Sequence, residues 1–267
     1  MSIMKNFYKF ILLTVLWVSP IVVGQLPSAV SFGGDVFAAQ DKKKTRKVPA
    51  MREKTYKKLA EAQLMIDPDS IPREEGEEAP TPKGTPRDAI QMLLELRGAK
   101  GLNSYELAQI WNTLAFAYYT VEDMPSTINA YEQILRQGVI SEALELSSLR
   151  ALFQLYYADE KYRKAITYID RYQALQSSPD PQVTFIKATA YYQLEDFRES
   201  LRQAIRVEEI AGERRVKRLA GLEASIENRK TSEEKKLKAQ EKLDELKASV
   251  PVKENWWYLQ VVLYNEL

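Results

Sequence analysis

The clearest fold signal in this chain is the stretch WNTLAFAYYTVEDMPSTINAYEQILRQ, residues 111–137. It places aromatic residues before a turn and a small residue after it, and this pattern returns twice further along the chain. The small residues are Thr127, Ala165 and Ser200, which lie 38 and 35 residues apart. Repeats of this length are typical of stacked helix–turn–helix pairs, which bury their apolar stripes against their neighbours. We therefore predict an all-α solenoid over residues 111–207.

Three repeats share one register of apolar, aromatic and small positions. These positions are Leu114, Tyr118, Met124 and Thr127, then Leu152, Tyr156, Tyr162 and Ala165, then Tyr191, Phe197 and Ser200. At these residues the sequence resembles the tetratricopeptide repeat, although Ala115 and Phe153 stand at its glycine position and Lys187 at its leucine position. The resemblance implies a tetratricopeptide-type α-solenoid, with three core repeats over residues 102–207.

The ends of the expected helices follow from capping residues, prolines and glycines. Asn103 or Ser104 caps the first helix, Pro125 begins the second, and Gly138 ends it. The helix pairs are expected at 104–120 with 125–137, 142–157 with 162–175, and 182–194 with 197–210.

Residues 51–101 resemble one degenerate repeat that precedes the core. A helix is expected over 51–66, with Tyr56, Leu59, Ala60 and Gln63 at helical spacing on one face, and another over 88–96, with Ala89 at the small position. The segment 67–87 between them has five prolines and an acidic run, which predict a loop. An unrelated helical cap is the alternative, because terminal repeats are often atypical.

Residues 208–250 interrupt the repeat pattern with charges of both signs. We expect two charged helices, paired as a projecting coiled-coil hairpin, with Thr231 and Glu234 at the spacing of a capping box. A solvated excursion is the favoured reading, and partner binding is the alternative.

The last segment, residues 251–267, matches the first helix of a fourth core repeat. Its register residues are Trp257, Val261, Tyr264 and Leu267. We expect this repeat to be truncated, which would leave Trp257 and Leu267 without a face to bury them. The alternative is that this helix docks on the preceding repeat.

The first 38 residues have the layout of a secretory signal peptide. Lys5 and Lys9 precede an apolar run over 10–23, and small residues end at a cleavage site after Ala38. The run is shorter than the ~20 apolar residues that span a bilayer, which disfavours the alternative of an uncleaved membrane anchor. Cleavage would take the formal charge from +1 to zero, so the composition gives no electrostatic sign of nucleic-acid binding. The basic arm over 39–50 is expected to be a disordered tail, with contact to anionic lipid as its alternative.

Two residue types are missing from the composition. The chain has no cysteine, which excludes disulfides, thiolate nucleophiles and zinc–cysteine sites. It also has no histidine, which excludes Ser–His–Asp catalysis and histidine-ligated metals. We therefore predict no catalytic residue, no metal site and no cofactor.

The resemblance also implies a binding groove, because the first helices of tetratricopeptide repeats line a concave surface. The corresponding residues are Asn112, Phe116, Tyr119, Arg150, Gln154, Tyr157, Phe185, Thr189 and Tyr192. Amides can bond a peptide backbone, and tyrosines supply rigid area with a polar tip, so this set suits an extended peptide. Packing between repeats is the alternative role for each tyrosine. The two-lysine clamp of chaperone-binding members is not visible.

Four local strings refine the resemblance. They are Leu102–Glu106, Ala108–Asn112, Asp180–Pro181 and Glu254–Trp257, and they are similar to exported tetratricopeptide proteins encoded with TonB energy-transduction systems of Gram-negative bacteria. The resemblance implies a periplasmic scaffold that contacts TonB or its Exb partners, associated with the inner membrane if the signal is not cleaved. It brings no functional residues with it, and it leaves the oligomeric state open.

Two other functions stay open. One is a scaffold in cell-envelope assembly or division, with the same fold and another partner. The other is a peptidoglycan-active enzyme on a helical solenoid, which we disfavour because no stretch outside the repeats is long enough for a separate lysozyme-like domain.

Overall fold

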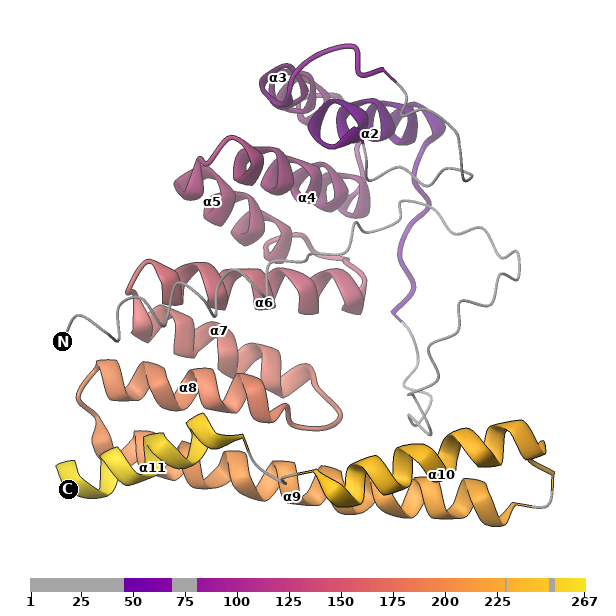
Figure 1. Ribbon diagram of the computed structural model, residues 1–267. Helices are drawn as coiled ribbons and strands as arrows, with labels where there is room; N and C mark the ends of the chain where they lie inside the picture. Colours follow the sequence, from indigo (N-terminus) through magenta and orange to yellow (C-terminus); the bar gives the residue numbers. More distant parts are fainter. Residues whose placement is uncertain (1–45, 69–80, 229, 250–252) are drawn as a thin grey trace. The chain divides into compact units, whose positions relative to one another are not determined.

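The computed structural model describes residues 46–68, 81–228, 230–249 and 253–267 (Figure 1). The predicted signal peptide, most of the basic arm and the middle of the proline-rich loop lie outside these residues. In the described part, every regular element is a helix, as the sequence predicts. The described chain divides between Asp159 and Glu160 into two compact units, and each is treated by itself below.

The described part of the N-terminal unit is a stack of five helices. They are α2 (Glu53–Ile66), α3 (Pro86–Arg97), α4 (Ser104–Thr120), α5 (Met124–Leu135) and α6 (Glu142–Ala158). Each packs on the next, and α2 also packs on α4. Leu59, Leu93, Ile110, Leu114 and Ile134 are fully buried, so the core runs without a break from α2 through α5. A continuous core between helix pairs is the packing that the repeat pattern predicts.

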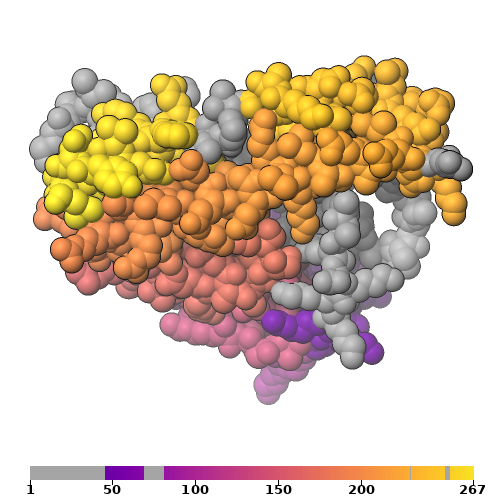
Figure 2. Space-filling view, turned by 90° about the horizontal axis from the view of Figure 1, so that it is seen from below, coloured from indigo at the N-terminus to yellow at the C-terminus, as the bar shows by residue number. Residues whose placement is uncertain are grey.

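Five helices are also described in the C-terminal unit. They are α7 (Tyr162–Leu175), α8 (Pro181–Gln193), α9 (Phe197–Glu227), α10 (Glu233–Ala248) and α11 (Glu254–Glu266). Helix α8 packs between α7 and α9, while α10 and α11 both pack on α9 (Figure 1). From the side shown in Figure 2, α10 and α11 lie along α9 in gold and yellow. Helix α9 is therefore the common support of this unit.

The predicted helix bounds are confirmed within two residues for both helices of the first two core repeats and for α8. The exception is α9, because the sequence predicts an end near residue 210 and the helix continues to Glu227. The segment after Ile210 is rich in Glu, Arg, Ala and Leu, which favour helix. Gly212 and Gly221 do not interrupt it, since a glycine costs a helix only ~1 kcal/mol. The predicted boundary at residue 208 thus lies inside one helix.

The small residues of the repeats are buried as predicted. Thr127, Ala165, Ser200 and also Ala89 are 0% exposed. The Thr127 hydroxyl donates to the carbonyl of Asp123 over 2.8 Å, and the Ser200 hydroxyl donates to the carbonyl of Ala188 on α8 over 2.8 Å. A larger side chain at Ser200 would therefore force α9 away from α8.

The predicted apolar face of α2 is wrong, because the buried residues are displaced from the predicted ones by about one position in the sequence. Thr55, Leu59, Ala62 and Met65 are buried, whereas Tyr56 is 43% exposed. The buried face has to meet both α3 and α4, and a single helix's pattern does not show where two neighbours lie. Only Leu59 belongs to both the predicted and the observed face.

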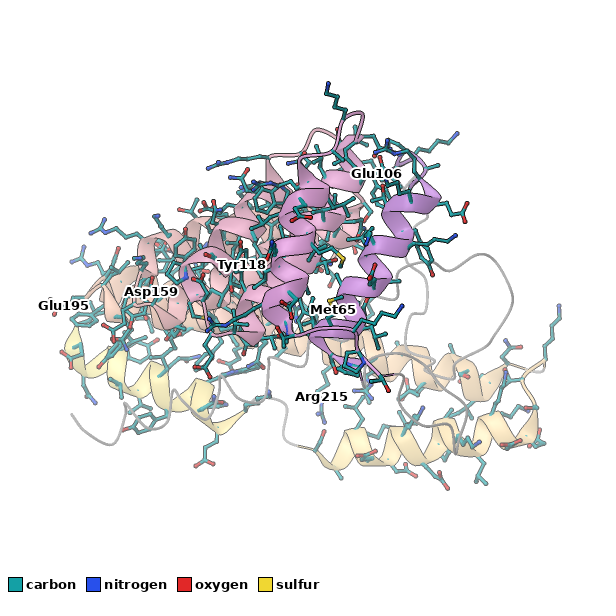
Figure 3. All side chains as sticks on the ribbon, turned by 90° about the horizontal axis from the view of Figure 1, so that it is seen from above. Met65, Glu106, Tyr118, Asp159, Glu195 and Arg215 are labelled. Atoms are coloured by element: carbon teal, nitrogen blue, oxygen red, sulfur yellow. The ribbon has the colours of Figure 1, made fainter. Side chains whose placement is uncertain are left out.

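The charged segment forms a helical hairpin, as expected, from the second half of α9 and all of α10. Its polar contacts include Arg215 on α9, whose guanidinium donates to the Ser249 hydroxyl over 3.1 Å and is labelled in Figure 3. The predicted capping box of Thr231 and Glu234 is wrong, because Ser232 is the N-cap and makes no side-chain cap bond. Glu234 instead accepts from Lys238 over 2.6 Å, since an ion pair one turn along the helix competes for its carboxylate. None of the described helices is both long and apolar enough to cross a membrane.

Candidate peptide-binding surface

Three of the predicted groove residues lie along one face of α4. Asn112, Phe116 and Tyr119 are all half-buried. Phe116 packs against the core of the N-terminal unit, so its ring anchors the face as well as lining it. Tyr119 lies near Tyr131 of α5, and burial together with this neighbour raises the pKa of Tyr131 to about 12. Tyr131 therefore stays neutral at physiological pH.

Three more lie on α6 of the same unit. Arg150 is exposed, and Gln154 and Tyr157 are half-buried. The opposite side of α6 is fixed to α5, because the Tyr156 hydroxyl donates to the Glu132 carboxylate over 2.7 Å. Ser141 caps the start of the helix by accepting from the amide of Leu144. These bonds hold α6 so that a cation, an amide and a phenol remain at least partly accessible.

The remaining three residues lie on α8, in the C-terminal unit, and do not form an open face. Phe185 and Thr189 are buried, at 9% and 8% exposed. The ring of Phe185 lies 6.1 Å from that of Trp256 on α11, and the ring of Tyr192 lies 5.7 Å from that of Phe197. In this repeat the aromatics serve packing, which was the alternative role. The nine predicted residues are thus divided between the two units, with six in the N-terminal unit and three in the C-terminal one.

The polar centre of the N-terminal unit is Glu106, which was not among the predicted site residues and is labelled in Figure 3. Its carboxylate is buried and accepts from the Thr55 hydroxyl at 2.7 Å, from the Arg52 guanidinium at 2.9 Å and from the backbone amide of Asn103 at 3.0 Å. Burial raises the pKa of Glu106, but the bonds from Arg52, Thr55 and Asn103 outweigh it and lower the pKa to about 2. The spacing of Asn103 and Glu106, which forms a complete capping box, was the available signal.

The segment that precedes α2 is itself an extended peptide bound to this unit. The side-chain amide of Asn103 donates to the carbonyl of Ala50 over 3.0 Å, at the start of α4. Near the start of α6, the guanidinium of Arg46 pairs with Glu145 over 2.8 Å and donates to the carbonyl of Ile140. These helices can therefore bind extended chain in two ways. An amide can donate to a backbone carbonyl, and a carboxylate can pair with a cation.

No three acidic side chains in the described part of the chain are grouped so that they could hold a metal ion. The candidate surface therefore offers hydrogen bonds, one cation and aromatic area. Such a surface is suited to recognition of a polypeptide.

Comparison with known proteins adds little to this geometry. No family model matches the sequence, and no curated protein matches it. One similar solved structure holds nearly identical TPR-like repeats of a Podosopora anserina protein described as a kinesin light chain, with 16% identity, a TM-score of 0.37 and coverage of 68% of this chain and 86% of that one. A second structure, of the same repeats with one substitution, has 13% identity, a TM-score of 0.41 and coverage of 81% and 97%.

These values are too low for either structure to support an argument about this chain. The class of fold rests on the helix pairs themselves. Their lengths, short turns and buried small residues define a tetratricopeptide-type α-solenoid with a charged helical insertion.

Proposed function

We propose that this protein is a scaffold that binds an extended segment of another protein and catalyses no reaction. The observation that carries the proposal is the accessible set on α4 and α6 of one unit: Asn112, Phe116, Tyr119, Arg150, Gln154 and Tyr157. We call these six residues the α4–α6 surface. Two amides, two phenols and one cation lie there with one apolar ring, a mixture that can bond a peptide backbone and bury its side chains.

The contacts of residues 46–50 support this proposal. Within this chain, a side chain at the start of α4 binds the backbone carbonyl of Ala50, and Glu145 of α6 binds the side chain of Arg46. The bond from Asn103 to a main-chain carbonyl does not depend on the side chains of the bound segment. Binding of this kind gives affinity through the backbone, and neighbouring side chains then select the sequence.

The finer proposal is a periplasmic accessory of a TonB energy-transduction system, with TonB or an Exb protein as partner. It is supported by the signal-peptide pattern of residues 1–38 and by the resemblance of the four local strings. The near-zero charge expected after cleavage agrees with a protein partner and not with nucleic acid.

The test is a pull-down from the periplasm of a Gram-negative host that expresses TonB, ExbB and ExbD, with the exported protein as bait. We expect recovery of TonB or an Exb protein. Arg150→Ala combined with Gln154→Ala should reduce that recovery at least tenfold. A tenfold loss of affinity corresponds to ~1.4 kcal/mol, and residues at the centre of an interface often contribute that much to the binding free energy.

The matched control is Arg218→Ala combined with Lys217→Ala, which changes exposed cations on the charged hairpin and should leave recovery unchanged. Recovery of a different envelope protein that depends on Arg150 and Gln154 would support the scaffold and reject the TonB assignment. Equal recovery with both variant pairs would refute the α4–α6 surface.

A further inference from the structure

Gln109 of α4 is a buried polar residue whose side chain makes no hydrogen bond within the described part of the chain. It is 7% exposed. The bond that it receives from the Thr113 hydroxyl, over 3.0 Å, goes to its backbone carbonyl and leaves the side-chain amide unused. Burial of an unpaired amide is unfavourable, and an apolar residue of similar volume avoids that cost. The stability of the fold therefore does not explain a glutamine at this position.

Gln109 lies on the same side of α4 as the α4–α6 surface. It follows Tyr105 by four residues, and it precedes Asn112 by three and Phe116 by seven. These spacings bring side chains to one face of a helix. The three neighbours are half-buried, so this face of α4 opens to solvent. Gln109 is thus the most buried of the four and lies in the middle of an open face.

The end of the Gln109 side chain reaches the surface, although most of the residue is covered. Among the residues that the structure describes, the indole nitrogen of Trp256 is the one side-chain nitrogen or oxygen that lacks both solvent contact and a hydrogen bond. The amide atoms of Gln109 also lack a hydrogen bond, so they keep their contact with solvent. The amide is therefore aimed out of the core and into the α4–α6 surface.

Two more side-chain amides of this surface are unused. Asn112 of α4 and Gln154 of α6 are half-buried, and neither side chain bonds any residue in the described ranges. A half-buried glutamine elsewhere is used internally, since Gln173 of α7 donates to the Thr184 hydroxyl over 3.1 Å. Together with Gln109, this surface offers three amides to a ligand.

The chemistry of these amides matches the backbone of an extended chain. A primary amide has a carbonyl that accepts and an NH2 group that donates, so it can bond the N–H and the C=O of one peptide residue together. In an extended chain, alternate residues present both groups to the same side and repeat every ~6.6–6.8 Å. Residues three apart on a helix have Cβ atoms ~5–6 Å apart, and the longer glutamine side chain can span the difference. Gln109 and Asn112 can therefore bond two alternate residues of one extended segment.

We propose that Gln109 and Asn112 bind the backbone of the partner segment at two alternate residues. This role rests on the proposed function, and it adds that the α4–α6 surface recognises the peptide group itself. The partner must present a free backbone N–H at both residues, so a proline at either one is excluded. Because Gln109 is already buried, its side chain loses little conformational freedom on binding.

The test uses as its probe a peptide of about twelve residues, selected against the full chain from a random display library and labelled with a fluorophore. Anisotropy gives its affinity, first unmodified and then with each backbone nitrogen methylated in turn. We expect one N-methyl group to weaken binding to the original protein about tenfold or more, but binding to Gln109→Leu less than about threefold, because that variant has already lost the bond. A second N-methyl group, two residues away, should have the same relation to Asn112→Leu.

Gln240→Leu is the matched control. It removes an exposed amide on α10 that donates to Asp244 over 2.9 Å, and it should leave every affinity unchanged. Thermal melting checks the fold, and Gln109→Leu should not lower Tm, because it removes a buried group that had no partner in the described chain. Asn112→Leu changes a half-buried position and keeps the proposal testable if Gln109→Leu does not fold.

The outcomes separate this role from the proposed function. Suppose that binding requires Arg150 and Gln154, but that Gln109→Leu and Asn112→Leu change neither the affinity nor the effect of any N-methyl group. The backbone role is then refuted and the α4–α6 surface stands. If no library peptide binds, or if binding does not depend on Arg150 and Gln154, the α4–α6 surface is refuted and the backbone role with it.

Discussion

Glu106 is a charged side chain buried inside the N-terminal unit. It is a fully buried carboxylate with donors from three places in the sequence, Arg52, Thr55 and Asn103. It joins the start of α2 to the start of α4, so it closes the N-terminal end of the stack. Its charge is stabilised in the folded state because donors surround it, whereas in the unfolded chain it would be an ordinary glutamate.

This difference makes the stability of the unit depend on pH. The pKa of Glu106 falls from 4.5 to about 2 on folding, so its stabilisation is complete above the unfolded pKa and is lost as the pH falls through the folded one. At about 1.4 kcal/mol per pKa unit, the full contribution is on the order of 3 kcal/mol. We predict that Glu106→Gln destabilises the protein by this order at pH 7 and by much less at pH 2.

Urea unfolding followed by circular dichroism, at pH 7, 4 and 2, measures this loss. Glu95→Gln is the control, since Glu95 is exposed on α3 and should change stability by less than ~0.5 kcal/mol. If Glu106→Gln were equally destabilising at all three values, the effect would come from packing and not from the charge.

At the scale of the elements, three turns between helices each contain one residue in a strained, left-handed conformation. Glu122, Glu160 and Glu195 have positive φ angles of 61°, 56° and 60°, and each lies five positions before a small residue of the repeat. In the first turn, the amide of Asp123 donates to the carbonyl of Tyr118 over 2.9 Å and that of Glu122 to the carbonyl of Tyr119 over 3.0 Å. This is the Schellman arrangement, which ends a helix on a left-handed residue.

The left-handed conformation costs a residue with a side chain ~1–2 kcal/mol, and glycine removes that cost while loosening the unfolded chain. We predict that Glu122→Gly stabilises the protein by about 0.5–1 kcal/mol, which raises Tm by ~1–4 °C. Thermal melting measures the shift.

Gln91→Gly, at an exposed position in the middle of α3, is the control and should lower stability by ~1 kcal/mol, because helical glycine is unfavourable. A lower Tm for Glu122→Gly would contradict this prediction. It would mean that glycine does not relieve the backbone strain of the turn and that contacts of the Glu122 side chain stabilise the protein.

At the scale of the whole molecule, burial is distributed unevenly. In α10 only Ala239 and Leu243 are buried, and Leu237 is 63% exposed. Helix α10 is held to α9 mainly by surface contacts such as that of Lys247 with Glu223 at 3.4 Å, and surface ion pairs contribute little. By contrast, α4 has eight buried residues.

Local unfolding should therefore require less free energy in α10 than in α4. We predict that backbone amides of residues 237–248 exchange with solvent at least ~100-fold faster than those of residues 108–117, because few apolar contacts must break to open α10. Hydrogen exchange measured by mass spectrometry after proteolysis resolves the two segments.

Leu243→Ala should increase exchange in α10 further and leave α4 unchanged. Equal protection of the two segments in the original chain would show that the hairpin is held by more than the contacts described here.

The sequence alone determined the all-α class, the repeat register and most helix ends. These depend on local chemistry: the spacing of Thr127, Ala165 and Ser200, the cap at Asn103 or Ser104, and the proline at Pro125. A pattern read along one chain reports which residues can be buried. It does not report which neighbour buries them.

The tertiary structure decided the rest. Phe185 occupies a predicted groove position, yet Trp256 packs on it, because a helix about 70 residues later in the chain docks there. The same docking leaves Trp257 exposed and turns Trp256 inward, a choice between adjacent tryptophans that no periodicity could make. Glu106 likewise became central only when Arg52 and Thr55 were brought to it by the packing of α2 on α4.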